Sequence, residues 1–306
     1  MSTLFDSFRK QQIPTRDGLV VAAFDSGPPS ADDAGPTLFL VNGLGGNPAA
    51  WTHLVKHFAP RHRIATWDYR GLYASRFDAT TDARYKRGEV ALDMDAHRDD
   101  ALRVLDALGI ERAVFLGWSM GVQLNWELYR HHHNRVLSMV QICGAPANVL
   151  DTTAFGAIGK AVAFPSMDLW RRVAGKFGSV VAKAWASPRA LAAAAALGAV
   201  SPSIDTNVAS GIIAEYVALD FDVYNKILAA LAAADASALL PTIDRPVLLV
   251  AGERDVFTPA PLSEAMAKVI PGSELLVIKG GSHYLPIEFP ALVNETIASF
   301  LARRIR

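Results

Sequence analysis

The chain has 306 residues, of which 51% are hydrophobic, so it can bury a large core and still carry an insertion. Its 30 Lys and Arg residues balance its 30 Asp and Glu residues. A nucleic-acid-binding protein usually shows a basic excess or a basic stripe, so the sequence argues against nucleic acid as a partner.

Cys143 is the single cysteine, which excludes an intrachain disulfide and a zinc-binding cysteine cluster. A lone cysteine fits a reducing compartment. The first 18 residues lack the apolar core of a signal peptide. The most apolar run, residues 191–200, is shorter than the roughly 20 residues that cross a bilayer. We therefore expect a cytoplasmic protein without a membrane span.

Strand and helix patterns alternate along the first half of the chain. A hairpin is predicted first, with a turn at residues 16–18. Asn47 and Pro48 are typical of a helix start. Such alternation predicts a parallel sheet with crossover helices. The elements expected after the hairpin are strands at 37–41, 63–69, 113–118 and 135–144, and helices at 49–59, 89–108 and 120–130.

The alternation stops at residues 147–240, which are rich in alanine and helix formers. We expect an all-helical insertion there, between two core segments at 1–146 and 241–306. Strands at 246–252 and 273–280 and helices at 259–269 and 287–304 resume the pattern. The insertion's aromatic residues are Phe155, Phe164, Trp170, Phe177, Trp185, Tyr216, Phe221 and Tyr224.

The sequence Gly117-Trp118-Ser119-Met120-Gly121 follows a predicted strand and opens a helix. This is the context of a nucleophile elbow, in which a tight turn lifts the serine above the sheet edge. The flanking glycines fit a turn that tolerates little bulk. The five-residue pattern alone also occurs by chance, and the alternative is a glycine-rich turn with an idle serine. The flanking strand and helix favour the nucleophile.

A serine nucleophile needs a base, usually a histidine held by a carboxylate. His283 and Asp255 each follow one of the last two predicted strands, at the sheet edge where open parallel sheets gather their sites. Their order, Ser119, Asp255, His283, is the order expected for such a triad. Glu253 is a rival carboxylate, and Asp255 could instead cap the following helix.

The remaining histidines are weaker candidates. His97 lies in a charged helix, and three consecutive histidines at 131–133 point in different directions on a helix end. Metal pairs on helices prefer i, i+4 spacing. We therefore expect no metal, and no organic cofactor.

A glycine-rich loop, residues 42–46, follows the strand at 37–41. Its free backbone amides could stabilise an oxyanion, with Leu44 and Met120 as the expected N–H donors. A phosphate-binding loop is the alternative, but neither Gly-Lys-Ser/Thr nor GxGxxG is present. Asn42, Gly43, Trp118 and Tyr284 are candidate substrate-pocket residues.

These motifs together resemble the capped α/β-hydrolase superfamily, in its serine-nucleophile, esterase- and haloperoxidase-like branch. The matching segments are NGLGG, the loop from Asp68 to Ser75, GWSMG, AGERDVFTP and GGSHYLPIEFP, in that order. The resemblance implies an α/β fold with a mostly parallel eight-stranded sheet, helices on both faces, and the insertion as a cap.

Two positions depart from the family pattern. Asn42 replaces a histidine, although asparagine can still hydrogen-bond locally, and Tyr73 stands where glycine is common. Serine at position 119 argues against the relatives with an aspartate nucleophile, the epoxide hydrolases and dehalogenases.

The expected activity is hydrolysis of a carboxylic ester, lactone or thioester of a small, largely apolar substrate. A carbon–carbon bond hydrolase, a cofactor-free perhydrolase and a slow, hydrolase-derived ligand sensor are alternatives with the same triad. The sequence leaves the oligomeric state open.

Overall fold

The computed structural model describes residues 4–30, 34–147, 187–196 and 199–305. Its centre is one eight-stranded sheet in the order β1-β2-β4-β3-β5-β6-β7-β8. The strands are β1 (Arg9–Pro14), β2 (Val20–Asp25), β3 (Leu38–Val41), β4 (Ile64–Trp67), β5 (Ala113–Trp118), β6 (Val136–Ile142), β7 (Val247–Gly252) and β8 (Glu274–Ile278).

The sheet is antiparallel only at its first edge. β2 pairs antiparallel with both β1 and β4, and the strands from β4 to β8 pair in parallel. Side chains of β3, β5 and β7 are buried throughout, as expected for parallel strands covered on both faces. The predicted hairpin and the mostly parallel eight-stranded sheet are confirmed.

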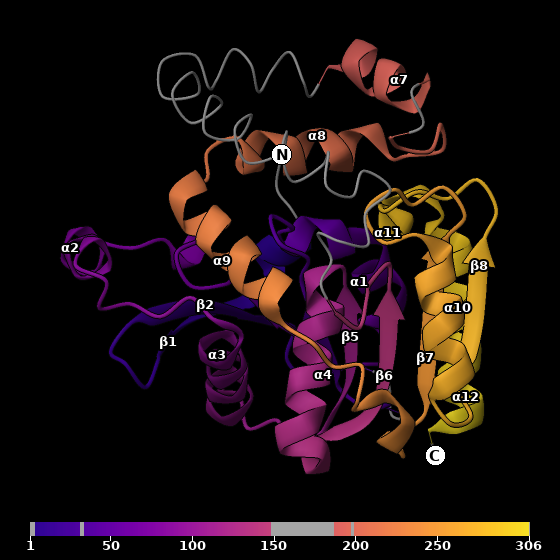
Figure 1. Ribbon diagram of the computed structural model, residues 1–306, viewed down its shortest axis with the longest axis horizontal. Helices are drawn as coiled ribbons and strands as arrows, with labels where there is room; N and C mark the ends of the chain where they lie inside the picture. The colour runs from indigo at the N-terminus through magenta and orange to yellow at the C-terminus, as the bar shows by residue number, and fades with distance from the viewer. Residues whose placement is uncertain (1–3, 31–33, 148–186, 197–198, 306) are drawn as a thin grey trace.

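Helices cover both faces of the sheet (Figure 1). α3 (Met94–Ala107), α4 (Met120–His132) and α10 (Ala260–Val269) pack into one apolar core, and α1 (Thr52–Phe58) and α12 (Pro290–Arg304) into the other. Short elements complete the described core: η1 (Leu4–Ser7), η2 (Pro48–Trp51), η3 (Tyr73–Ser75), η4 (His133–Arg135), η5 (Leu240–Thr242) and α11 (Leu285–Glu288).

Two predicted helix starts were wrong, and one helix was missed. The helix expected at 89–108 begins at Met94, because Asp93 caps it by accepting from the backbone N–H of Ala96. The sequence before it forms a separate helix that we did not predict, α2 (Ala79–Lys86). The closing helix begins at Pro290, and α11 occupies the residues before it.

The described part of residues 147–240 contains α7 (Pro188–Ala196), α8 (Thr206–Tyr216) and α9 (Phe221–Ala233). Figure 1 shows α7 and α8 beyond the carboxyl ends of the parallel strands. Of the aromatic residues noted in this stretch, Tyr216, Phe221 and Tyr224 form a ring cluster with centroids 5.5–5.8 Å apart. Phe155, Phe164, Trp170, Phe177 and Trp185 lie outside the described residues.

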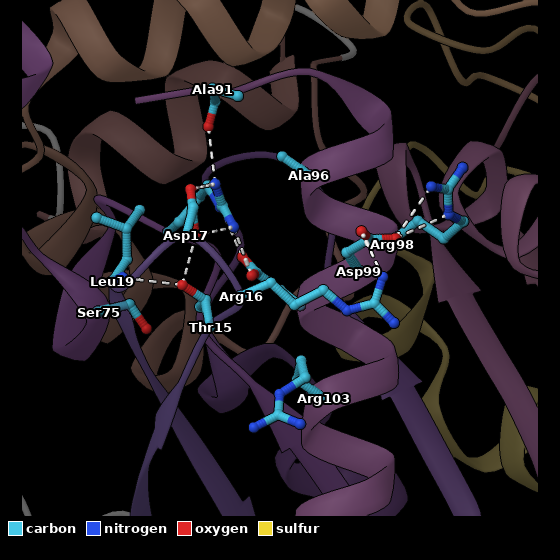
Figure 2. A network of polar contacts seen from close by, with 12 residues as sticks. Thr15, Arg16, Asp17, Leu19, Ser75, Ala91, Ala96, Arg98, Asp99 and Arg103 are labelled. Carbon is cyan, nitrogen blue, oxygen red and sulfur yellow. Dashed lines mark hydrogen bonds and ion pairs between the residues drawn. The ribbon is translucent and has the colours of Figure 1, made fainter. Parts of the chain in front are cut away.

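The loop after β4 is anchored by a buried arginine. Arg70 donates to both carboxylate oxygens of Asp100 on α3, at 2.7 and 2.6 Å, and pairs with Asp17 in the hairpin turn at 2.9 Å. It also donates to the carbonyl of Ala91 at 3.0 Å, and Figure 2 shows Ala91 and Asp17 in this network of polar contacts. Arg70 therefore anchors the loop that carries Tyr73 to α3 and to the hairpin turn.

Candidate active site

Ser119 occupies the turn between β5 and α4. Its backbone has φ 56° and ψ −118°, a conformation that is strained for a residue with a side chain. A Cβ on Gly117 would lie 2.6 Å from Nδ2 of Asn125, and a Cβ on Gly121 would lie 2.0 Å from the carbonyl oxygen of Val41. Both flanking positions therefore require glycine, as the elbow pattern predicted.

His283 and Asp255 form a direct pair at the neighbouring strand ends. Nδ1 of His283 lies 2.8 Å from Oδ2 of Asp255, and their side chains are 10% and 0% exposed. An ionised carboxylate only accepts hydrogen bonds, so Nδ1 carries the shared proton. Nε2 is then left as a proton acceptor, which is what a general base requires.

Asp255 accepts three further hydrogen bonds. The backbone N–H groups of Phe257 and Thr258 donate to Oδ1 at 2.8 and 2.9 Å, and the Thr258 hydroxyl donates to Oδ2 at 2.8 Å. Burial alone would raise the pKa of this carboxyl, but His283 and these donors outweigh it and hold the pKa below its ordinary value. Asp255 is therefore ionised at neutral pH and can orient the imidazole.

The rival carboxylate lies elsewhere. Glu253 is exposed, and its Oε2 accepts from the backbone N–H of Gly280 at 2.8 Å. Asp255 also supports the turn that precedes α10, so its capping role and its pairing with His283 coexist. The structure thus brings Asp255, and not Glu253, to the imidazole.

The glycine-rich loop lies directly against the elbow. A Cβ on Gly43 would lie 3.0 Å from Cβ of Ser119, so a larger residue here would press against the serine. Met120 is the first residue of α4, and the first four N–H groups of a helix have no partner within it. The backbone amide of Met120 is therefore at a helix N-terminus, next to the serine, where developing negative charge is favoured.

Asn42 corrects one expectation. Its side chain is buried and fully engaged: Nδ2 donates to the carbonyl of Trp67 at 3.1 Å, and Oδ1 accepts from Nε1 of Trp51 at 2.6 Å. It does not line the cavity described below. The asparagine ties the base of the loop to β4 and η2, and the pocket role expected for it was wrong.

Ser119 and His283 open into one cavity of about 810 Å³. Its wall is mostly alkyl and aromatic, and α7, α8 and α9 supply much of it. Gly43, Trp118 and Tyr284 line it as expected, and Leu44 does as well. Other lining residues include Leu191, Ile204, Ile212, Ile213, Tyr216, Tyr224, Leu228, Leu231, Phe257, Thr258 and Ile287.

Two further side chains support the loop of the base, and neither was predicted in this role. Nε1 of Trp118 donates to the carbonyl of His283 at 2.8 Å. Glu288, buried on α11, accepts from the backbone N–H and the hydroxyl of Ser282 at 2.8 and 2.5 Å. These contacts fix the loop on which His283 stands.

One trio of potential metal ligands occurs among the described residues. Cys143, Asp255 and His283 each offer one possible ligand atom, and these three atoms lie within 4.8 Å of one another. Asp255 and His283 are already joined by their hydrogen bond, and burial raises the pKa of the Cys143 thiol well above its ordinary value. A protonated thiol is a poor metal ligand, so this donor set does not favour a metal.

The sequence profile of the family described as "alpha/beta hydrolase fold" matches residues 36–290. The chain belongs to this family. Its range covers the glycine-rich loop, the elbow and the loops that carry Asp255 and His283. This α/β-hydrolase is therefore an enzyme of the hydrolase class, as the resemblance implied.

Curated relatives span nearly the whole α/β-hydrolase. A protein of Agrobacterium fabrum named for carbamate hydrolysis, RutD, is 27% identical over 273 residues, covering 88% of this chain and 94% of its own. The 3-oxoadipate enol-lactonase 2 of Acinetobacter baylyi is 26% identical over 268 residues, covering 88% of this chain and 89% of its own.

Solved structures share the fold at lower identity. A thermophilic esterase from Thermogutta terrifontis has a TM-score of 0.71 at 19% identity, covering 97% of this chain and all of that one. The enol-lactonase of Burkholderia xenovorans LB400 has a TM-score of 0.69 at 20% identity, covering 95% and 100%. No described helix of the present α/β-hydrolase is both long and apolar enough to span a membrane.

Proposed function

We propose that this hydrolase cleaves a carboxylic ester, lactone or thioester of a small, largely apolar substrate through an acyl-enzyme. The observation that carries the proposal is the shared cavity: Ser119 on its strained turn and His283, paired with Asp255, line the same apolar space. Relatives named as an enol-lactonase and an esterase support a carbonyl substrate.

In the proposed reaction Ser119 attacks the substrate carbonyl while Nε2 of His283 takes the hydroxyl proton. The imidazolium that forms is stabilised by Asp255 and returns the proton to the leaving group. The backbone N–H groups of Leu44 and Met120 stabilise the tetrahedral oxyanion. His283 then activates water, which releases the acid and restores the serine.

We further propose that residues 147–240 act as a cap on a core formed by 1–146 and 241–306. The described helices of this stretch support it, since Leu191, Ile213 and Leu228 come from α7, α8 and α9 and line the cavity. An alkyl wall of this kind favours an apolar acyl or alcohol group, because it offers few partners to a polar one.

The test is hydrolysis of p-nitrophenyl esters of increasing acyl length, with a lactone and an aryl carbamate alongside. Ser119→Ala should abolish turnover. Ser138→Ala is the matched control, because Ser138 is buried on β6 and donates to the carbonyl of Pro246, away from the cavity. Activity that survives Ser119→Ala, or the absence of any activity in the wild type, would contradict the proposal.

A further inference from the structure

Two tyrosines of one loop hold the two ends of the glycine-rich loop. Tyr69 donates to the carbonyl of Asn42 at 2.5 Å, and Tyr73 donates to the carbonyl of Gly45 at 2.5 Å. The segment between these two carbonyls contains Leu44, the proposed oxyanion donor. Both phenols are buried, and burial raises the pKa of each well above its ordinary value. Each therefore remains a donor at neutral pH.

The backbone at Tyr73 is unusual. Its φ is +47°, in the left-handed region that glycine adopts without strain and that is costly for a residue with a Cβ. A glycine here would avoid this cost but would provide no hydroxyl. The strained backbone persists because the surrounding structure fixes it, and the phenol reaches across to Gly45.

Aromatic rings of the helical insertion also confine Gly45. Its φ is +74°, and a Cβ there would lie 2.6 Å from the ring of Tyr216 and 3.0 Å from that of Tyr224. The loop is thus in contact with aromatic rings of α8 and α9 as well as with the hydroxyl of Tyr73. A segment with glycine at positions 43, 45 and 46 loses much conformational entropy on ordering. Contacts that order this segment before the substrate binds would reduce the entropy lost when a backbone amide is oriented toward the oxyanion.

We propose that Tyr73 is a positioning residue of this hydrolase, which fixes the glycine-rich loop by donating a hydrogen bond to the carbonyl of Gly45. Tyr73 acts through the loop and does not touch the reacting atoms. The inference rests on the proposed function, because it assigns the loop its role in stabilising an oxyanion.

The test compares Tyr73→Phe with Tyr85→Phe. The control removes a similar hydroxyl, since Tyr85 is buried and donates to Asp222 at 2.6 Å, and Tyr85 does not line the cavity. Tyr73→Phe should lower kcat for the best ester about tenfold with KM unchanged, a smaller loss than removal of an oxyanion donor itself. Affinity for an alkyl boronic acid, which forms a tetrahedral adduct with serine, should fall by the same factor. Tyr85→Phe should change neither.

A second measurement does not depend on activity. Amide hydrogen exchange of the peptide covering residues 42–47 should quicken in Tyr73→Phe and stay as in the wild type in Tyr85→Phe. Unchanged exchange in that segment overturns the proposal, and so does faster exchange with unchanged kcat and boronate affinity. A wild type without esterase activity would contradict the proposed function instead, and the exchange result would still decide whether Tyr73 holds the loop.

Discussion

Oδ2 of Asp255 accepts from two side chains at once: Nδ1 of His283 at 2.8 Å and the Thr258 hydroxyl at 2.8 Å. The threonine hydroxyl also lies 3.4 Å from the same imidazole nitrogen. The carboxylate is therefore fixed by its own loop before it orients the base. Asp255 is thus placed to orient the imidazole, whereas the nearby Glu253 accepts from the backbone amide of Gly280.

The first prediction concerns that choice of carboxylate. Asp255→Asn should lower kcat by about 10⁴-fold, because an amide favours the wrong tautomer of the histidine. Glu253→Gln should stay within about twofold of the wild type, since Glu253 contacts only the exposed Gly280 amide in this region. Steady-state kinetics on one ester decide the matter. Equal losses in the two variants would contradict the assignment.

The second prediction concerns the buried ion pair of Arg70. Arg70→Met should lower the free energy of unfolding by about 3–5 kcal/mol, because Asp100, with a side chain 1% exposed, is left without its partner. Arg16→Met is the control: Arg16 is 67% exposed and pairs with Asp99 at the surface (Figure 2), so its loss should cost less than about 1 kcal/mol. Urea unfolding measures both. Similar costs would show that the buried pair does not anchor the loop.

The third prediction concerns Asp68. Burial raises the pKa of this carboxyl to about 7, with a further contribution from Glu215. Between the ordinary value of 3.8 and about 7 the folded chain holds a proton that the unfolded chain has lost, so stability falls as pH rises through this window. Asp68→Asn removes this ionisation. The free energy of unfolding of the variant, taken relative to that of the wild type, should therefore be a few kcal/mol higher at pH 8 than at pH 5.

The thermal unfolding temperature at the two pH values checks this. Asp106→Asn is a suitable control, because Asp106 is 53% exposed and its substitution should give a similar small change at both. An Asp68→Asn advantage that does not grow with pH would be inconsistent with a buried, protonated carboxyl.

The fourth prediction concerns His97, which is fully buried with its ring centroid 5.1 Å from that of Tyr69. Burial, aided by Arg70, lowers its pKa to about 3. Below pH 6.5 the unfolded chain therefore binds a proton that the folded chain does not, and stability should fall by up to about 1.4 kcal/mol per pH unit. His97→Phe should reduce this loss between pH 7.5 and 5. The control His131→Gln changes an exposed histidine and should leave the loss of stability between pH 7.5 and 5 unchanged.

The sheet and the order of the chemistry-bearing loops could be predicted because their signals are local. Apolar runs bounded by turn residues gave β3, β5 and β7, and two glycines around Ser119 gave the elbow. The same local reasoning placed Asp255 and His283 after adjacent strands. Their pairing remained a prediction about distance, which the structure supplies at 2.8 Å.

The contacts that escaped prediction join residues far apart in the sequence. Tyr73 and Gly45 are separated by 28 residues, and nothing near either indicates their hydrogen bond. His97 was placed in a charged helix, yet its side chain is fully buried, three residues before the buried Asp100 of the same helix. Asn42 was predicted as a pocket residue from its place beside the glycines, whereas Trp51 and Trp67 determine its direction.

Trp118 occupies the position that the elbow pattern leaves open to any residue. In this protein it is not open, because its indole N–H holds the carbonyl of His283 at 2.8 Å. The strand that delivers the nucleophile thus also supports the base, from a part of the chain 165 residues away. A substitution of Trp118 should therefore occur in related sequences together with a change in the length of the loop that carries His283. Either change alone would leave a buried carbonyl without its hydrogen-bond donor.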